Sequence, residues 1–145
     1  MSQAENTCSL CPEGWVSFQS KCYFFSTDLL DWQSSQEKCM SMCGHLVIVE
    51  SAEEQNFLEN KTKDFNDGGY WIGLTDQKNE NTFVWVNNRP LDSNNRFWDK
   101  EEPSGKRDEN CVQIWRTNQQ KRWHDYPCGT VAKRVCETTA FLLYN

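Results

Sequence analysis

Two stretches carry apolar residues at the three- and four-residue spacing of an amphipathic helix. The first follows Asp31, which can cap a helix N-terminus, and ends before Gly44, a residue suited to a C-terminal cap. The second begins at Ser51, which forms a capping-box pattern with Glu54, and runs to about Lys61. The pattern therefore predicts two short helices.

Short apolar and aromatic runs predict strands around and after these helices. A strand pair is expected over residues 16–26, and a buried strand over residues 46–49. Further strands are expected at residues 70–74, 83–86, 111–115 and 134–137, and at Trp123. Two helices followed mainly by strands indicate an α+β domain.

Residues 87–110 show almost no periodicity, and uncovered loops of this length usually carry function or lack order. This loop contains Trp98 and ends next to Cys111, which favours order. Glu102 and Glu109 lie in it, and Asp125 follows further along the chain. Because calcium takes about six to eight oxygen ligands, this carboxylate-rich region is a candidate calcium site.

Composition narrows the classes of function. The 145 residues suit one domain, and a net charge of −6 without a basic stripe excludes nucleic acid as the expected partner. Eight cysteines indicate an oxidising compartment. Cys8 and Cys11 form a single C-x-x-C without the second ligand pair of a zinc site. With no signal peptide or membrane-length apolar run, we expect an excised ectodomain, and Asn60 opens a glycosylation sequon.

Several motifs follow one another in an order that identifies a family. They are Cys11-Pro12-x-Gly14-Trp15, Cys22-Tyr23-Phe24, Trp71-Ile72-Gly73-Leu74, Glu102-Pro103-Ser104, Glu109-Asn110-Cys111 and Trp123-x-Asp125. Together they resemble the C-type lectin domain, most closely that of the type II receptors of myeloid and dendritic cells. The resemblance covers residues 11–137, with residues 1–10 as a flank or neck remnant and residues 138–145 as a tail. It implies two helices packed on antiparallel sheets and a long calcium-binding loop.

The resemblance also implies three disulfides, Cys11–Cys22, Cys39–Cys136 and Cys111–Cys128. Cys8 and Cys43 are left over. Since Cys43 lies one helical turn beyond Cys39 and faces roughly the same way, we predict a Cys8–Cys43 bridge within the chain. The rival hypothesis is a bond between two chains through Cys8.

In sugar-binding relatives, the principal calcium site also holds the sugar. The resemblance carries both roles, calcium-binding and sugar-binding, to Glu102, Ser104, Glu109, His124 and Asp125, with a cis bond between Glu102 and Pro103. Ser104 and His124 replace asparagines of the family pattern. Imidazole suits zinc, copper or nickel better than calcium. Two hypotheses follow for His124: it turns outward and leaves the ion one ligand short, or it shifts the site toward a transition metal.

An auxiliary calcium site in relatives uses acids that follow the Trp71-Ile72-Gly73-Leu74 strand. The resemblance assigns it to Asp76, Glu80, Glu109 and Asn110, with the backbone of Asn110 as a ligand. At the principal site, Glu102 in place of the glutamine of galactose-type relatives implies mannose, fucose or N-acetylglucosamine as the sugar.

An enzyme is not expected. Glu102 and Glu109 could imitate a glycosidase pair, but a metal site also accounts for Asp125. His45 precedes a buried strand and fits a core histidine better than a base. Two functions remain: a calcium-dependent (Ca2+) lectin domain of an immune receptor on the extracellular side of the plasma membrane or secreted, and a lectin-like domain that binds protein without metal. Either could form a homo-oligomer through a stalk outside this chain.

Overall fold

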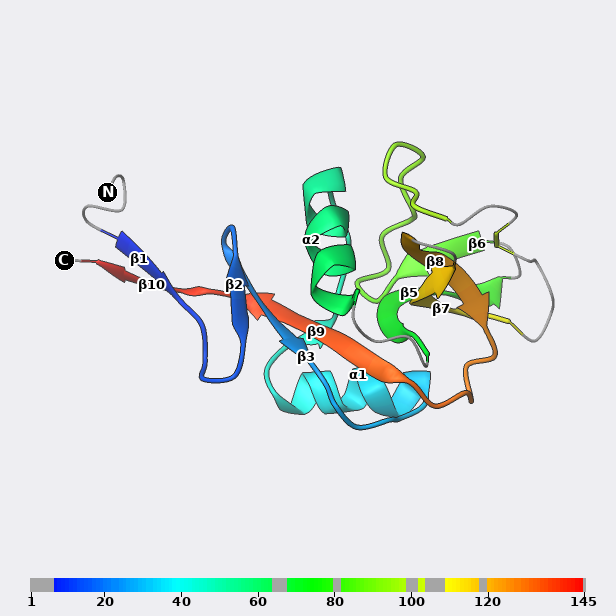
Figure 1. Ribbon diagram of the computed structural model, residues 1–145, viewed down its shortest axis with the longest axis horizontal. Coiled ribbons are helices and arrows are strands. Elements are labelled where there is room, and N and C mark those ends of the chain that lie inside the picture. The colour runs from blue at the N-terminus through cyan, green and yellow to red at the C-terminus, as the bar shows by residue number, and fades with distance from the viewer. Residues whose placement is uncertain are drawn as a thin grey trace.

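The computed structural model describes residues 7–63, 68–79, 82–98, 102–103, 109–117 and 120–144. Within these ranges, two helices lie against a set of strands (Figure 1). The elements are β1 (Thr7–Leu10), β2 (Val16–Phe18), β3 (Lys21–Phe25), α1 (Trp32–Ser41), β4 (His45–Leu46), α2 (Ala52–Thr62), β5 (Tyr70–Asn79), β6 (Thr82–Trp85), β7 (Cys111–Thr117), β8 (Gln120–Tyr126), β9 (Lys133–Thr139) and β10 (Phe141–Tyr144).

The main sheet confirms the α+β class. Its strands follow the order β2-β3-β9-β5-β7-β8, with β4 also on β9 and β6 on β5. Most of its pairings are antiparallel, as the resemblance implied, but β5 pairs parallel with β9, and Tyr70 stands opposite Lys133. β9 pairs antiparallel with β3 on its other side, so this one strand joins the two halves of the sheet.

The two helices begin at the predicted caps. Asp31 accepts a hydrogen bond from the backbone N–H of Ser34 (2.8 Å), and Ser51 accepts one from Glu54 (3.1 Å). The Glu54 carboxylate reaches back to the N–H of Glu50, one residue before the cap (2.8 Å). These bonds satisfy N–H groups that have no partner inside a helix.

The end of α1 differs by one residue from the prediction. Cys43, not Gly44, has the left-handed conformation (φ 66°), and the N–H of Gly44 donates to the carbonyl of Cys39 (2.9 Å). This is the Schellman pattern, with a cysteine at the position that glycine usually takes. A glycine is needed at 44 for another reason: a Cβ there would lie 2.5 Å from the carbonyl oxygen of Glu137.

Aromatic and aliphatic side chains share the core, and two of its buried indoles donate hydrogen bonds to backbone carbonyls. Trp32, the buried first residue of α1, donates from Nε1 to the carbonyl of Ile72, and Trp71 donates to that of Leu30, both over 2.9 Å. Such bonds remove the cost of burying a polar N–H. The core thus fixes β5, the strand that carries the Trp71-Ile72-Gly73-Leu74 motif.

The three disulfides implied by the resemblance are present: Cys11–Cys22, Cys39–Cys136 and Cys111–Cys128. The predicted Cys8–Cys43 bridge was wrong, because Cys43 is an exposed free thiol. Cys8 belongs to β1, where its backbone pairs with Leu143 of β10. Figure 1 shows this two-stranded ribbon extending from the body of the domain, away from α1.

The β1–β10 ribbon is an element that the sequence pattern did not predict. It joins the segments expected to be a flank and a tail, from Thr7 opposite Tyr144 to Leu10 opposite Phe141. In the described ranges, neither helix has the length and apolar character needed to cross a membrane.

Candidate functional site: the calcium-type loop

The hairpin of β7 and β8 carries one side of the site. Its register places Val112 opposite Asp125 and Gln113 opposite His124, and the Cys111–Cys128 disulfide closes the base. Asp125 is only 3% exposed. A carboxylate held at such low exposure needs a proton, hydrogen bonds or a cation as compensation.

The long loop is anchored to this hairpin through tryptophans. Trp98 forms an isolated bridge with Trp123, their rings meet edge to face at 5.5 Å, and the N–H of Trp123 donates to the carbonyl of Phe97 (3.0 Å). The fully buried indole of Trp123 donates to Gln55 of α2 (2.8 Å). Trp98 and Trp123 therefore have a structural role. Gln55 is a supporting residue that sequence reasoning missed.

The peptide bond between Glu102 and Pro103 is cis, as the resemblance implied. The side chain of Glu102 is hydrogen-bonded to that of Asp125, so two acids meet directly. Burial, this bond and the charge of Asp125 raise the pKa of Glu102 to about 7, with Glu109 adding to the repulsion. Without a cation, Glu102 therefore keeps its proton to a higher pH than an isolated glutamate does.

His124 lies inside the site and not outside it. Its Nδ1 is 3.4 Å from Oε2 of Glu102, and its side chain is 13% exposed. The predicted outward orientation is therefore wrong in this structure. The reason is the stack of its ring on Tyr126 (6.1 Å between centroids, 26° between planes), together with the attraction of the carboxylate.

Tyr126 is a second site residue that sequence reasoning missed. Its pKa is raised to about 12, first by burial and then by the charges of Glu102, Glu109 and Asp125. The ring also packs against Trp115 (5.4 Å). Only its position three residues after a motif tryptophan could have pointed to this role.

The oxygen atoms around this loop are of the kind that binds a hard cation. Oε1 of Glu102 and Oδ1 of Asn110 are buried without a hydrogen-bond partner in the described part of the chain. Oxygen atoms of this kind are the ligands that calcium prefers. Over the same ranges, no three His, Cys, Asp or Glu side chains are grouped around a common point. Ser104 lies outside the described residues.

The auxiliary site is only partly described. Asp76 is 2% exposed, and its N–H donates to the carbonyl of Asn110 (3.0 Å), which also accepts from the hydroxyl of Thr75. These two hydrogen bonds tie the Asn110 carbonyl to the strand that carries Asp76, so the predicted backbone ligand and the predicted acid lie next to each other. Glu80 lies outside the described residues.

Comparisons with known proteins agree with this geometry. The family model for the lectin C-type domain matches residues 28–138. The chain belongs to the C-type lectin domain family. Mouse C-type lectin domain family 4 member E is 41% identical over 132 residues, which are 88% of this chain and 59% of that protein. The chain thus spans about three fifths of the length of this curated relative.

Solved C-type lectin domains share the fold over nearly their whole length. The domain of murine dendritic cell inhibitory receptor 2, in complex with N-glycan, has a TM-score of 0.81 and is 34% identical, covering 89% of this chain and 98% of that one. The cow CD23 domain, in the presence of a GlcNAc2Man3 oligosaccharide, has a TM-score of 0.79 and is 38% identical, covering 92% and 99%. The resemblance to myeloid and dendritic-cell receptors is confirmed.

This is a family of binding domains rather than enzymes, in agreement with the expectation from the sequence. The ring of His45 fits that view, because its Nδ1 lies 2.8 Å from the carbonyl oxygen of Leu46, inside the sheet. The domain is of the carbohydrate-recognition type.

Proposed function

We propose that the domain binds calcium in the loop around Glu102 and, through it, a sugar of the mannose, fucose or N-acetylglucosamine type. The observation that carries the proposal is the direct contact of the Glu102 and Asp125 carboxyl groups. Like charges this close are unfavourable unless a proton or a cation compensates them.

Glu102, Glu109 and Asp125 would hold the ion, with Ser104 as a hydroxyl ligand. Bound calcium would coordinate two neighbouring sugar hydroxyls, which would complete its set of about six to eight oxygens. The remaining carboxylate lone pairs would accept hydrogen bonds from the same hydroxyls and orient the sugar. The murine relative in complex with N-glycan and the cow relative with its oligosaccharide support a glycan ligand.

We infer an extracellular receptor domain, which would be joined to a membrane by a stalk outside this chain and could cluster through it. The three disulfides and the greater length of the relatives support this inference. Asn60 is exposed on α2 and would carry the glycan of its sequon.

A glycan array, read in calcium and again in a chelator, tests the calcium function. Binding to mannose-, fucose- or N-acetylglucosamine-bearing glycans should disappear in chelator and return with calcium but not with zinc. Glu102→Gln should abolish it, whereas the control Glu53→Gln, on an exposed acid of α2, should not. Glycan binding that ignores the chelator would contradict the calcium proposal.

One observation favours a second function, binding of a protein ligand without metal. The imidazole of His124 lies 3.4 Å from Oε2 of Glu102, where it takes up a carboxylate oxygen that a calcium ion would need. Thermal stability that is unchanged by calcium, together with an empty glycan array, would support this second function.

A further inference from the structure

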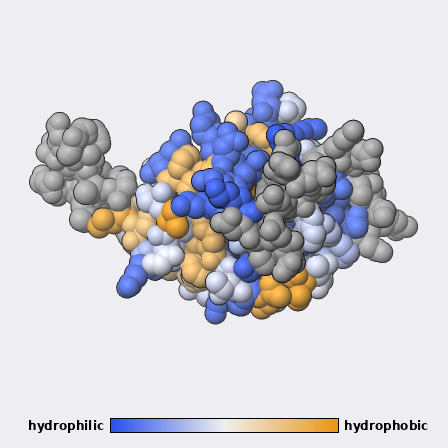
Figure 2. Space-filling view, in the orientation of Figure 1, coloured by the Kyte–Doolittle hydropathy of each residue, from blue (hydrophilic) through white to orange (hydrophobic). Residues whose placement is uncertain are grey.

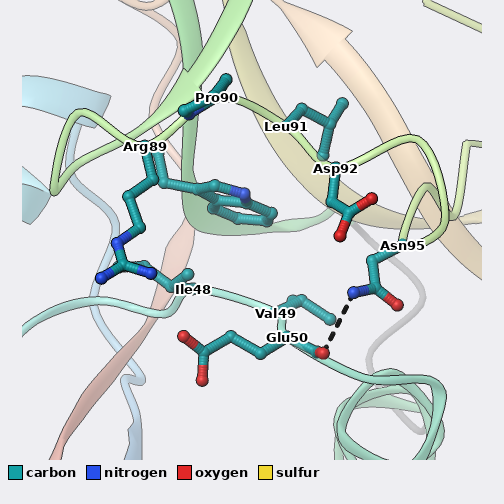
Figure 3. Close-up of a pocket in the computed structure, with 9 residues that line it drawn as sticks. Ile48, Val49, Glu50, Arg89, Pro90, Leu91, Asp92 and Asn95 are labelled. Atoms are coloured by element: carbon teal, nitrogen blue, oxygen red, sulfur yellow. Dashed lines mark hydrogen bonds between the residues drawn. The ribbon is translucent and has the colours of Figure 1, made fainter.

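A cavity of about 460 Å³ lies between the segment that joins β4 to α2 and the loop that follows β6 (Figure 3). None of the residues that line it is a calcium or sugar ligand of the site described above. Its volume falls within the usual range of small-ligand pockets. The proposed calcium and sugar site does not use this cavity.

The floor of the cavity is apolar and rigid. Ile48, Val49 and Trp85 line it and are 6%, 2% and 5% exposed. Trp85 is fixed from behind by an edge-to-face contact with Trp123 (5.6 Å). Leu91, half-buried, forms a side wall. This surface can receive the C–H face of a flat ligand without rearrangement.

The rim is polar and offers hydrogen bonds of both kinds. Figure 3 shows Arg89 and Asp92 descending from one segment on opposite sides of the space, with Glu50 and Asn95 below them. Arg89 carries only donors and the carboxylates only acceptors, whereas an asparagine amide has both.

Several rim groups are held in place and still have bonding capacity. Asp92 accepts from the N–H of Asn94 (2.9 Å) through one oxygen, and the Asn95 amide donates to the carbonyl of Glu50 (3.1 Å). Glu50 is paired with Lys21 (3.1 Å). The guanidinium of Arg89 has no hydrogen-bond or ion-pair partner in the described ranges.

We propose that this cavity is a second sugar subsite, which holds a neutral pyranose unit without a metal. Each sugar hydroxyl can both donate and accept a hydrogen bond. Hydroxyls on one side of the ring can therefore accept from Arg89, and hydroxyls on the other side can donate to Asp92. The ring presents an apolar C–H face to Trp85 and its neighbours. Glu50 and Asp92 would repel an acidic sugar, which is why the subsite favours a neutral one.

The subsite goes beyond the proposed calcium function and does not depend on it. A second hollow of about 350 Å³ shares Pro90 and Leu91 with this cavity and extends to Pro103, the neighbour of Glu102. An oligosaccharide held at the calcium loop could therefore continue toward the cavity along a surface that already exists.

Nuclear magnetic resonance of the whole 145-residue chain in chelator tests the subsite. The methyl glycosides of mannose, glucose, galactose and N-acetylglucosamine are added one at a time, with glycerol as a polyol that lacks a ring. We expect at least one pyranoside to shift the Trp85 indole and Asn95 amide signals saturably, with a dissociation constant on the order of millimolar. Arg89→Ala and Asp92→Ala should each weaken that binding roughly tenfold.

Arg96→Ala is the matched control for a single pyranose unit, since Arg96 is an exposed arginine of the same segment that borders the second hollow and not the cavity. It should leave the pyranoside affinity unchanged. Three results would overturn the subsite: no saturable shift with any pyranoside, equal shifts with glycerol, or undiminished affinity in Arg89→Ala. Because calcium is absent throughout, failure of the calcium proposal could neither produce nor remove these shifts.

Discussion

The imidazole of His124 faces the carboxylate of Glu102, with 3.4 Å between Nδ1 and Oε2. The contact occupies a carboxylate oxygen that a calcium ion would need. It also places a nitrogen where the family pattern has an oxygen ligand, and calcium prefers oxygen. This pair of residues therefore sets how strongly the loop can hold calcium.

Replacing His124 with asparagine should strengthen calcium binding. The amide oxygen of His124→Asn would add a ligand, and Oε2 of Glu102 would be released from the ring. One hydrogen bond or ligand contact to a charged group is worth about 1.5–3 kcal/mol, so calcium affinity should rise roughly tenfold or more. Isothermal titration with calcium measures the change.

His45→Asn is the control for that substitution, because His45 bonds to the carbonyl of Leu46 within the sheet and does not touch the loop. Its calcium affinity should equal that of the parent chain. An unchanged or weaker affinity in His124→Asn would show that the ring does not compete with the ion.

Protons should compete with calcium for the same carboxylates. Because the pKa of Glu102 is raised from 4.5 to about 7, the folded metal-free domain binds a proton there more tightly than the unfolded chain does. Its contribution to the free energy of unfolding is therefore full below pH 4.5 and is lost as the pH rises to about 7. Calcium must displace this proton, so calcium affinity should increase over the same interval.

Urea unfolding in chelator between pH 4.5 and pH 8, repeated in excess calcium, checks this dependence. In Glu102→Gln, the loss of stability across the interval should be smaller, because the titrating group is gone. Glu53→Gln, on an exposed acid of α2, should keep the parent profile. A parent profile that matches Glu102→Gln would contradict the assignment.

Local patterns could predict much of the fold. The caps at Asp31 and Ser51 depend on contacts three residues away, and both formed as expected. The ribbon of β1 and β10 and the parallel pairing of β5 with β9 depend on partners far apart in the sequence. Hydrophobic periodicity carries no information about partners that are distant in the sequence, and these pairings were missed for that reason.

Motif positions predicted two acids of the candidate site, but they did not predict how its side chains pack. Glu102 and Asp125 came from motif positions, and the structure brings their carboxyl groups together. The inward turn of His124 depends on its stack with Tyr126, and the support of Trp123 depends on Gln55 of α2. These are packing contacts between side chains, which no spacing rule encodes.

Removing the charge of Lys21 should destabilise the domain strongly. Its Nζ lies 3.1 Å from both Glu50 and Glu137 and 3.4 Å from Oε2 of Glu54, an oxygen that also accepts from the Tyr23 hydroxyl. Lys21→Met would leave buried carboxylates without their shared cation, at a cost of about 3 kcal/mol near neutral pH. Chemical unfolding measures the loss.

The destabilisation caused by Lys21→Met should become smaller as the pH falls. Burial already raises the pKa of Glu137 despite the opposing charge of Lys21, and removing that charge would raise it further. The stability missing from Lys21→Met should therefore return as the pH falls and Glu137 takes up a proton. Lys78→Met, on an exposed lysine bonded to Asn88, should cost little at any pH. Equal losses in the two variants would contradict the shared-cation role.

The free thiol of Cys43 should react in the folded domain. Cys43 is exposed and outside the three disulfides, so iodoacetamide should modify it without prior reduction. Peptide mass mapping under non-reducing conditions checks this result, with Cys39 as the protected internal reference. A peptide that links Cys8 to Cys43 would restore the bridge predicted from the sequence.

Gly44 should tolerate no side chain, although its backbone has an ordinary conformation. A Cβ at this position would lie 2.5 Å from the carbonyl oxygen of Glu137, which belongs to the central strand β9 and cannot move freely. Overpacking of this kind typically costs about 1–3 kcal/mol, so Gly44→Ala should lower the free energy of unfolding by that amount. Gly129→Ala is the matched control, since no atom lies within 4 Å of a Cβ there. The stability of Gly129→Ala should equal that of the parent chain. If Gly129→Ala lost as much stability as Gly44→Ala, the cause of both losses would be the backbone and not the contact with β9.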